Sequence, residues 1–187
     1  AVYGAQGRDP ITERDATKPV NPYGFSKLAC ERMLSDYRIA HGVRSICLRY
    51  FNAAGADPSS ELGEHHDPET HLIPLVLDAA AGRRDAVSVF GTDYDTQDGT
   101  AVRDYVHVSD LAAAHVSAAQ SLLAGADSAT FNLGTGSVAS VREVIDTAQA
   151  ATGRRICSVN APRREGDPAI LVASSDQARR HLGWAPQ

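Results

Sequence analysis

Two residues that could act together in proton transfer stand four positions apart, in the segment Tyr23-Gly24-Phe25-Ser26-Lys27. Side chains four apart on a helix lie on the same face, so this spacing brings a phenol close to an ammonium group. The nearby positive charge favours the phenolate, which is a general base. The same pair also occurs on ordinary exposed helices, so the motif alone leaves both interpretations open.

The residues around this motif predict a helix over 22–40. Asn21 is a capping residue, Pro22 suits the first turn, and Gly42 follows the end. Apolar residues at helical spacing predict one buried face, formed by Phe25, Leu28, Ala29, Met33 and Tyr37.

Along the rest of the chain, segments of helical period alternate with short β-rich segments, which predicts an α/β fold. Further helices are predicted over 72–81, 111–123, from the capping box Ser140-Val141-Arg142-Glu143 onward, and over 176–182. Strands are predicted to end at 1–4 and to cover 44–50, 86–90, 105–108, 130–133 and 155–159. Polar segments rich in glycine and proline predict loops over 5–21, 53–70 and 91–100.

Composition excludes several classes of protein. The 187 residues are 43% hydrophobic and 22% charged, which is typical of globular proteins. A net charge of −5 disfavours a broad nucleic-acid surface, and no uncharged apolar run reaches the roughly 20 residues of a membrane helix. Cys30, Cys47 and Cys157 are too few and too far apart for a disulfide framework or a zinc site. We therefore expect a cytoplasmic protein that binds neither nucleic acid nor membrane.

Further blocks extend the tyrosine–lysine motif into a family pattern. They are V-Y-G at 2–4, N-P-Y-G-F-S-K at 21–27, L-R-Y-F-N at 48–52, F-G-T-D-Y at 90–94, D-G-T-A-V-R-D-Y at 98–105 and R-R-E-G-D at 163–167. Together they resemble the UDP-glucose 4-epimerase family of the extended short-chain dehydrogenase/reductase superfamily, from residue 1 to residue 187. The resemblance implies a doubly wound, Rossmann-like parallel sheet interwoven with a smaller α/β substrate domain.

The resemblance also implies a division of the chain. Residues 1–52 would be the C-terminal part of the NAD-binding Rossmann-like domain. Residues 53–187 would form mainly the UDP-sugar-binding domain, with about 103–123 returning to the Rossmann-like domain. The family's glycine-rich NAD fingerprint and its catalytic serine or threonine would precede Ala1. We therefore expect both ends to be cut and the isolated chain to be inactive, with short natural termini as the alternative.

In this family NAD-dependent epimerisation at the sugar C4 passes through a transient 4-keto sugar. The resemblance implies that Tyr23 takes the proton of the C4 hydroxyl. Lys27 would hold the nicotinamide ribose and stabilise the phenolate, and Phe51 would contact the nicotinamide end of NAD. These three residues are the expected catalytic and cofactor-binding set.

The resemblance assigns the UDP-sugar to nine further residues. Within this set, strand residues would line the uracil pocket, two arginines would clamp the diphosphate, and an aspartate would accept from the ribose hydroxyls. The expected substrate-binding residues are Asn52, His71, Ser88, Val89, Phe90, Arg103, Arg164, Asp167 and Leu171. Two of them depart from the family pattern. His71 replaces an asparagine common in relatives, and Leu171 stands at the sugar-pocket gatekeeper, where a tyrosine would leave less space.

Two other patterns are discounted. G-T-G-S-V-A at 134–139 imitates a dinucleotide fingerprint, but no acidic residue closes the next predicted strand near Val159, so a tight turn is favoured. One acidic loop could suggest a metal site, but its residues lack ligand spacing on one element, so we predict a solvated loop and no metal. Its acids and histidines are Glu61, Glu64, His65, His66, Asp67 and Glu69.

Three questions stay open on the sequence. A nucleotide-sugar dehydratase of the same superfamily is an alternative enzyme, although the blocks around Arg103 and 163–167 favour the epimerase. A truncated, non-catalytic UDP-sugar-binding homologue is the alternative outside the enzymes. Relatives are commonly homodimers, and the helix over 22–40 is the expected interface.

Overall fold

A computed structural model describes residues 1–4 and 10–187, so the predicted loop over 5–21 lies partly outside the described residues. The described residues form two compact units. Unit 1 comprises residues 1–55, 104–137 and 171–187, and unit 2 comprises residues 56–103 and 138–170. Each contains helices and a parallel strand pair, so the predicted α/β class is confirmed. Among the described residues, no helix has the length and apolar character needed to cross a membrane.

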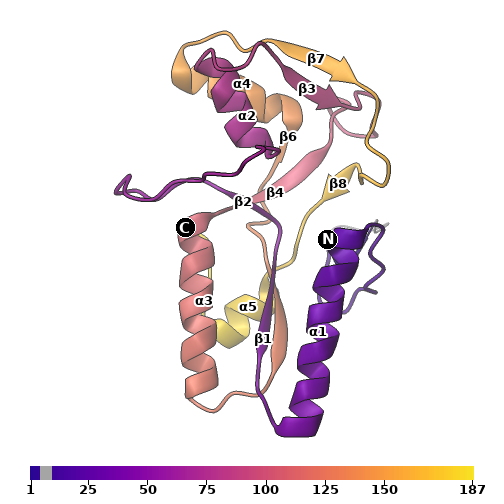
Figure 1. The fold of residues 1–187 in the computed structure, drawn as a ribbon, viewed down its shortest axis with the longest axis vertical. Helices are drawn as coiled ribbons and strands as arrows, with labels where there is room; N and C mark the ends of the chain where they lie inside the picture. Colours follow the sequence, from indigo (N-terminus) through magenta and orange to yellow (C-terminus); the bar gives the residue numbers. More distant parts are fainter. Residues whose placement is uncertain (5–9) are drawn as a thin grey trace. The chain divides into compact units, whose positions relative to one another are not determined.

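Unit 1 is built on a parallel strand pair with helices beside it (Figure 1). Strand β1 (Ile46–Tyr50) pairs with β5 (Ala129–Leu133), and α3 (Val108–Leu123) packs against β1 while α5 (Asp176–Leu182) packs against β5. Strand β2 (Asn52–Ala54) pairs in parallel with β4 (Val102–His107). The buried core residues of this unit are Val106, Leu111, Ala114, Phe131, Leu133, Ala178 and Trp184.

Unit 2 has its own strand pair and core. Strand β3 (Val87–Phe90) pairs in parallel with β7 (Ser158–Ala161), and α2 (Leu72–Ala80) packs against both β3 and α4 (Val141–Thr152). The unit also contains β6 (Val138–Ser140). Its buried core residues are Val76, Ala80, Val87, Val89, Ile145 and Ile156.

Helix α1 (Pro22–His41) begins and ends almost where the sequence predicts, because local signals fix both ends. The Asn21 side chain accepts a hydrogen bond from the Gly24 amide at 2.8 Å, and Gly42 adopts a left-handed φ of 67°. The predicted burial of its apolar face is only partly confirmed. Leu28 and Ala29 are half-buried, and Leu28 packs against a small buried cluster of unit 1. Phe25 and Tyr37, in contrast, are 67% and 54% exposed, so helical spacing identifies the apolar side but not how much of it is covered.

The predicted strand end at 1–4 is also wrong. Val2 and Tyr3 lie in a turn, and both are buried in a small cluster with Ile11. Apolar residues supply the tendency to form a strand, but a strand also needs a paired neighbour. Strand β4 begins three residues before the predicted 105, because the buried Asp104 hides the apolar alternation of this segment.

Candidate functional site

The tyrosine–lysine pair occupies the first turns of α1 in unit 1. The Lys27 Nζ lies 5.3 Å from the centroid of the Tyr23 ring, and Tyr23 is 64% exposed. Gly24 sits against the chain start, because a Cβ there would lie 2.7 Å from the Ala1 carbonyl oxygen. The structure therefore places a solvent-accessible phenol beside a cation, which is the arrangement a tyrosine base requires.

Glu31 continues the same face of α1, four residues beyond Lys27, and sequence analysis missed its role. Its carboxylate accepts hydrogen bonds from Arg49 Nε at 2.8 Å and Arg49 Nη2 at 2.5 Å. The two side chains are only 13% (Arg49) and 18% (Glu31) exposed. Burial alone would lower the pKa of Arg49, but its hydrogen bonds to Glu31 and Tyr3 raise it, so the guanidinium stays charged. This fork ties α1 to β1 and limits rotation of the face that carries Tyr23.

The Arg49 guanidinium also begins a chain of buried contacts. Its Nη1 donates to the Tyr3 hydroxyl at 2.7 Å, and that hydroxyl donates to Asn132 Oδ1 at 2.7 Å. The Asn132 amide group in turn donates to the Ile11 carbonyl at 3.1 Å. The four-residue spacing of Tyr23, Lys27 and Glu31 places Glu31 on the same face of α1, but it does not identify Arg49 or Tyr3 as partners.

Three predicted site residues lie elsewhere in unit 1. The Phe51 amide donates to the Leu133 carbonyl at 3.2 Å, so its N–H already extends the β1–β5 ladder. Asn52 opens β2 opposite Tyr105 and is half-buried. Leu171, like Phe51, packs against the cluster that contains Val2, Tyr3 and Ile11.

In unit 2 the structure brings together four residues predicted to bind UDP. The Arg164 guanidinium stacks over the Phe90 ring at 4.0 Å, and Arg103 Nη2 lies 3.4 Å from Asp167 Oδ1. Arg103 Nη1 also donates to the Pro168 carbonyl at 2.9 Å. The Arg103 side chain is only 12% exposed, so its planar fork is held in one position.

A tight turn joins the two halves of this group. The Asp167 amide donates to the Arg164 carbonyl at 3.2 Å, and Gly166 adopts a left-handed φ of 77°. A side chain at Gly166 would be strained in this conformation, so the glycine allows Arg164 and Asp167, both predicted to bind UDP, to lie in one turn.

The remaining predicted residues of unit 2 lie on β3 and at the start of α2. In β3, the Val89 side chain is 2% exposed and packs in the core, whereas Ser88 and Phe90 are half-buried on the alternate positions. Only the backbone of Val89 could therefore contact a base. His71 is the N-cap residue of α2, but its Nδ1 lies 2.8 Å from Glu69 Oε1 and 2.9 Å from Glu64 Oε1.

The glycine-rich segment 134–139 is not arranged to hold a phosphate at its first amides. Asp104 is fully buried and accepts hydrogen bonds from the amides of Thr135 at 2.8 Å and Gly136 at 3.2 Å. Because these two N–H groups already donate to a carboxylate of the protein, they are not available to bind a phosphate. The loop after β5 is therefore a turn held in place by Asp104, as the sequence favours.

Comparison with known proteins identifies a family and close relatives. Residues 1–134 match the NAD dependent epimerase/dehydratase family. The whole chain is 53% identical to a UDP-glucose 4-epimerase of Rhizobium meliloti and covers 57% of that protein. It also matches, over its whole length, a crystal structure of the Brucella ovis UDP-glucose 4-epimerase in complex with NAD, at 49% identity and a TM-score of 0.96, covering 57% of that chain. A Bifidobacterium longum UDP-glucose 4-epimerase solved with NAD+ and UDP matches at 42% identity and a TM-score of 0.92, with 56% of that chain covered.

Proposed function

Because the chain belongs to the NAD dependent epimerase/dehydratase family, we propose that it carries the catalytic base and UDP-binding residues of a UDP-glucose 4-epimerase. The reaction interconverts UDP-glucose and UDP-galactose through transient oxidation to a 4-keto sugar. The observation that carries the proposal is the 53% identity over all 187 residues to a UDP-glucose 4-epimerase. The chain spans 57% of that relative's length, so the activity is proposed for a protein that contains this chain.

The residues of unit 1 fit the nicotinamide end of NAD. The exposed Tyr23 ring and the Lys27 ammonium, 5.3 Å from its centroid, offer a proton acceptor and a hydrogen-bond donor side by side. When bound, NAD supplies reversible acceptance of the C4 hydride. Tyr23 Oη takes the proton of the C4 hydroxyl and returns it to the turned sugar, while Lys27 stabilises the phenolate.

A direct assay tests this function. The longest continuous reading frame that contains this chain, supplied with NAD and UDP-glucose, is expected to produce UDP-galactose until both sugars reach equilibrium. Loss of the sugar's hydroxyl as water would instead support the dehydratase. Binding of UDP with no sugar conversion would support the non-catalytic homologue.

The contacts within unit 2 predict the effect of removing either arginine. Arg103→Ala or Arg164→Ala is expected to weaken UDP binding by about 1.5–3 kcal/mol, the scale of a charge-assisted hydrogen bond. The reason is that each arginine is held beside a second UDP-binding candidate, Arg103 beside Asp167 and Arg164 over Phe90. Isothermal titration calorimetry with UDP measures this loss.

Arg83→Ala is the matched control, because Arg83 lies in the same unit, is 67% exposed and pairs with Asp78. Its removal should leave UDP affinity unchanged. Unaltered affinity in both Arg103→Ala and Arg164→Ala would show that the diphosphate is bound elsewhere.

The leucine at position 171 leads us to expect activity on UDP-N-acetylglucosamine that is measurable but lower than the activity on UDP-glucose. Leucine leaves space that a tyrosine ring would fill, and a missing clash discriminates weakly, by about 10–200-fold per small group. Leu171→Tyr should therefore suppress the N-acetyl activity and spare UDP-glucose. Values of kcat/KM for the two substrates measure this effect. If Leu171→Tyr leaves the ratio of the two values unchanged, Leu171 does not line the sugar pocket.

We also propose that the protein is a cytoplasmic homodimer that uses α1. Large apolar side chains on this helix are exposed, which is unfavourable in water unless another surface covers them. They are Phe25, Met33, Leu34, Tyr37 and Ile39. Sedimentation velocity should show a dimer that Tyr37→Asp weakens, and a monomer at micromolar concentration would contradict it. The proposed compartment rests on the cysteines, because Cys30, Cys47 and Cys157 are few, odd in number and far apart in the sequence.

A further inference from the structure

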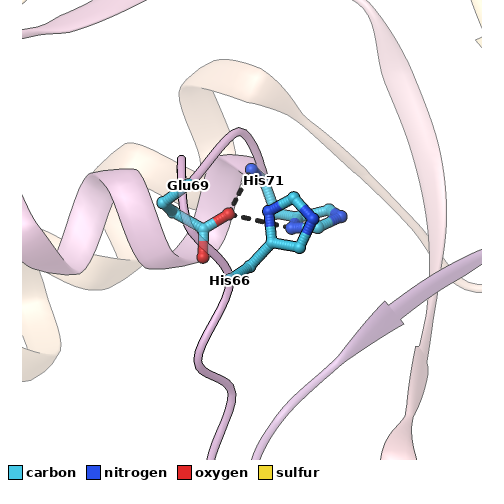
Figure 2. Close-up of side chains that lie close together, drawn as sticks. All are labelled: His66, Glu69 and His71. Carbon is cyan, nitrogen blue, oxygen red and sulfur yellow. Dashed lines mark hydrogen bonds and ion pairs between the residues drawn. The ribbon is translucent and has the colours of Figure 1, made fainter.

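We propose that the loop before α2 forms a binding site for a divalent transition-metal ion of the zinc class, with His66, Glu69 and His71 as its ligands. One ligand atom from each of the three residues lies within 4.8 Å of the other two (Figure 2). The two imidazole rings meet edge to face, with centroids 5.0 Å apart. Ligands of one zinc ion lie about 2.0–2.2 Å from it, so small side-chain rotations would close the set.

The backbone of the loop already orients the first ligand. His66 Nδ1 lies 2.9 Å from the Pro68 carbonyl oxygen. A carbonyl only accepts hydrogen bonds, so Nδ1 carries the hydrogen and Nε2 keeps its lone pair. Metal-binding histidines usually show this arrangement, in which one ring nitrogen donates to a carbonyl and the other binds the metal.

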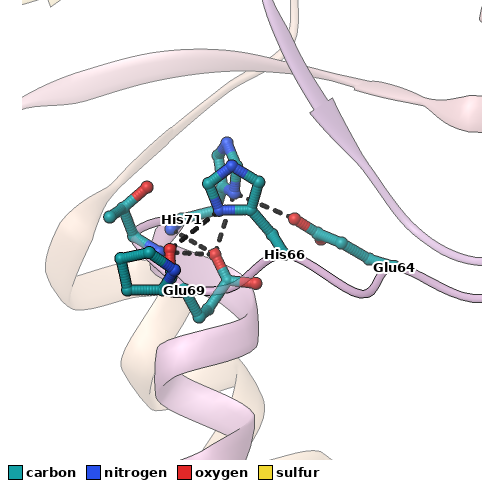
Figure 3. A network of polar contacts seen from close by, with 6 residues as sticks. Glu64, His66, Glu69 and His71 are labelled. Atoms are coloured by element: carbon teal, nitrogen blue, oxygen red, sulfur yellow. Dashed lines mark hydrogen bonds and ion pairs between the residues drawn. The ribbon is translucent and has the colours of Figure 1, made fainter.

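The other two ligands are held just as closely. Glu69 Oε1 accepts hydrogen bonds from the backbone amides of Thr70 at 2.6 Å and His71 at 2.7 Å, which fixes its carboxylate. That oxygen and Glu64 Oε1 both lie within 2.9 Å of His71 Nδ1 (Figure 3). Two carboxylates thus converge on one ring nitrogen. A divalent cation would balance both charges, and Glu64 is placed to become a fourth ligand.

The negative charge of the loop favours binding of a cation. The nitrogen and oxygen atoms that would bind the metal determine which cations are preferred. Residues 56–71 contain five acids and neither lysine nor arginine. Two imidazole nitrogens with carboxylate oxygens suit zinc, nickel or copper, whereas calcium and magnesium prefer oxygen ligands alone. His66 and His71 are exposed, so the ion can enter from solvent.

The sequence prediction of a solvated loop without a metal considered only Glu61 to Glu69. His71 was assigned to the substrate instead, and the loop brings it back beside His66 and Glu69. The proposal does not depend on epimerase activity, because its test measures metal binding directly.

Titration of the chelator-treated protein with Co²⁺, followed by the visible d–d absorption of the bound ion, tests the site. We expect one Co²⁺ per chain, displaced by one equivalent of Zn²⁺ but not by Ca²⁺ or Mg²⁺. His66→Ala and Glu69→Gln should each weaken Zn²⁺ binding by at least about tenfold. His65→Ala is the matched control, because His65 is the neighbouring histidine of the same loop and lies outside the ligand set.

Each variant is checked for retained folding by far-UV circular dichroism before titration. Glu69→Gln keeps the size of the side chain and its hydrogen-bonding oxygen, so it remains informative if His66→Ala is unstable. Absence of Co²⁺ binding would overturn the proposal. So would an affinity unaffected by Glu69→Gln, or one that His65→Ala lowers as much as His66→Ala does, since either result would show non-specific binding to loop histidines.

Discussion

Tyr23→Phe is expected to lower epimerase turnover by about 10²–10⁴-fold, the usual contribution of a positioned general base. Phenylalanine keeps the ring over which the Lys27 ammonium lies, but removes the oxygen that we propose accepts the sugar proton. Affinity for UDP should change little, because Arg103, Arg164 and Asp167 are untouched. Steady-state kcat for UDP-glucose, together with calorimetric titration of UDP, measures both effects.

Tyr37→Phe provides the matched control. Tyr37 lies on the same helix and is 54% exposed, but its ring contacts His41 rather than a lysine. Its hydroxyl is expected to be dispensable for turnover. If Tyr23→Phe retains the rate of the unmodified enzyme, Tyr23 is not the base.

Asp104→Ala is expected to lower the free energy of unfolding by about 3–5 kcal/mol, because a buried donor left without a partner costs about 1–3 kcal/mol. Asp104 is fully buried and accepts from the amides of Thr135, Gly136 and Ala173 and from the Thr135 hydroxyl. Alanine leaves these donors in the protein interior with no acceptor. Urea unfolding followed by circular dichroism measures the change.

Asp104→Asn removes one of the two acceptor oxygens, whereas Asp104→Ala removes both. Because one acceptor oxygen remains, the loss in the free energy of unfolding should be smaller than that of Asp104→Ala. Asp127→Ala is the surface control, since the Asp127 side chain is 86% exposed and its contact with Arg38 is 3.6 Å long. Equal stability of Asp104→Ala and Asp127→Ala would mean that the carboxylate does not hold the loop after β5.

Elements fixed by local chemistry could be predicted from sequence. The capping box that begins α4 is present as predicted, with Ser140 and Glu143 each bonded to the other's backbone amide. Both ends of α1 could also be predicted, because Asn21 and Gly42 each act within one turn of the helix end that they define. The spacing of Tyr23 and Lys27 also predicted their contact.

Features that depend on distant partners could not be predicted in this way. The apolar face of α1 was recognisable, but spacing does not say which surface covers it. The Glu31–Arg49 fork joins residues 18 apart on different elements, and neither is unusual in its own segment. His71 lies beside Glu69 and His66 because of the path of the loop backbone. The hydrophobic periodicity of the sequence does not predict that path.

The order of elements in unit 1 also has a consequence for synthesis on the ribosome. Ile46 of β1 pairs with Ala129 of β5, 83 residues later, and at 5–20 residues per second about 4–17 s separate the two. The Ile11 amide bonds to the carbonyl of Val172, and Trp184 completes the core. The core of unit 1 therefore cannot form until nearly all of this chain has been synthesised. Until then, the apolar residues of its strands are exposed to solvent.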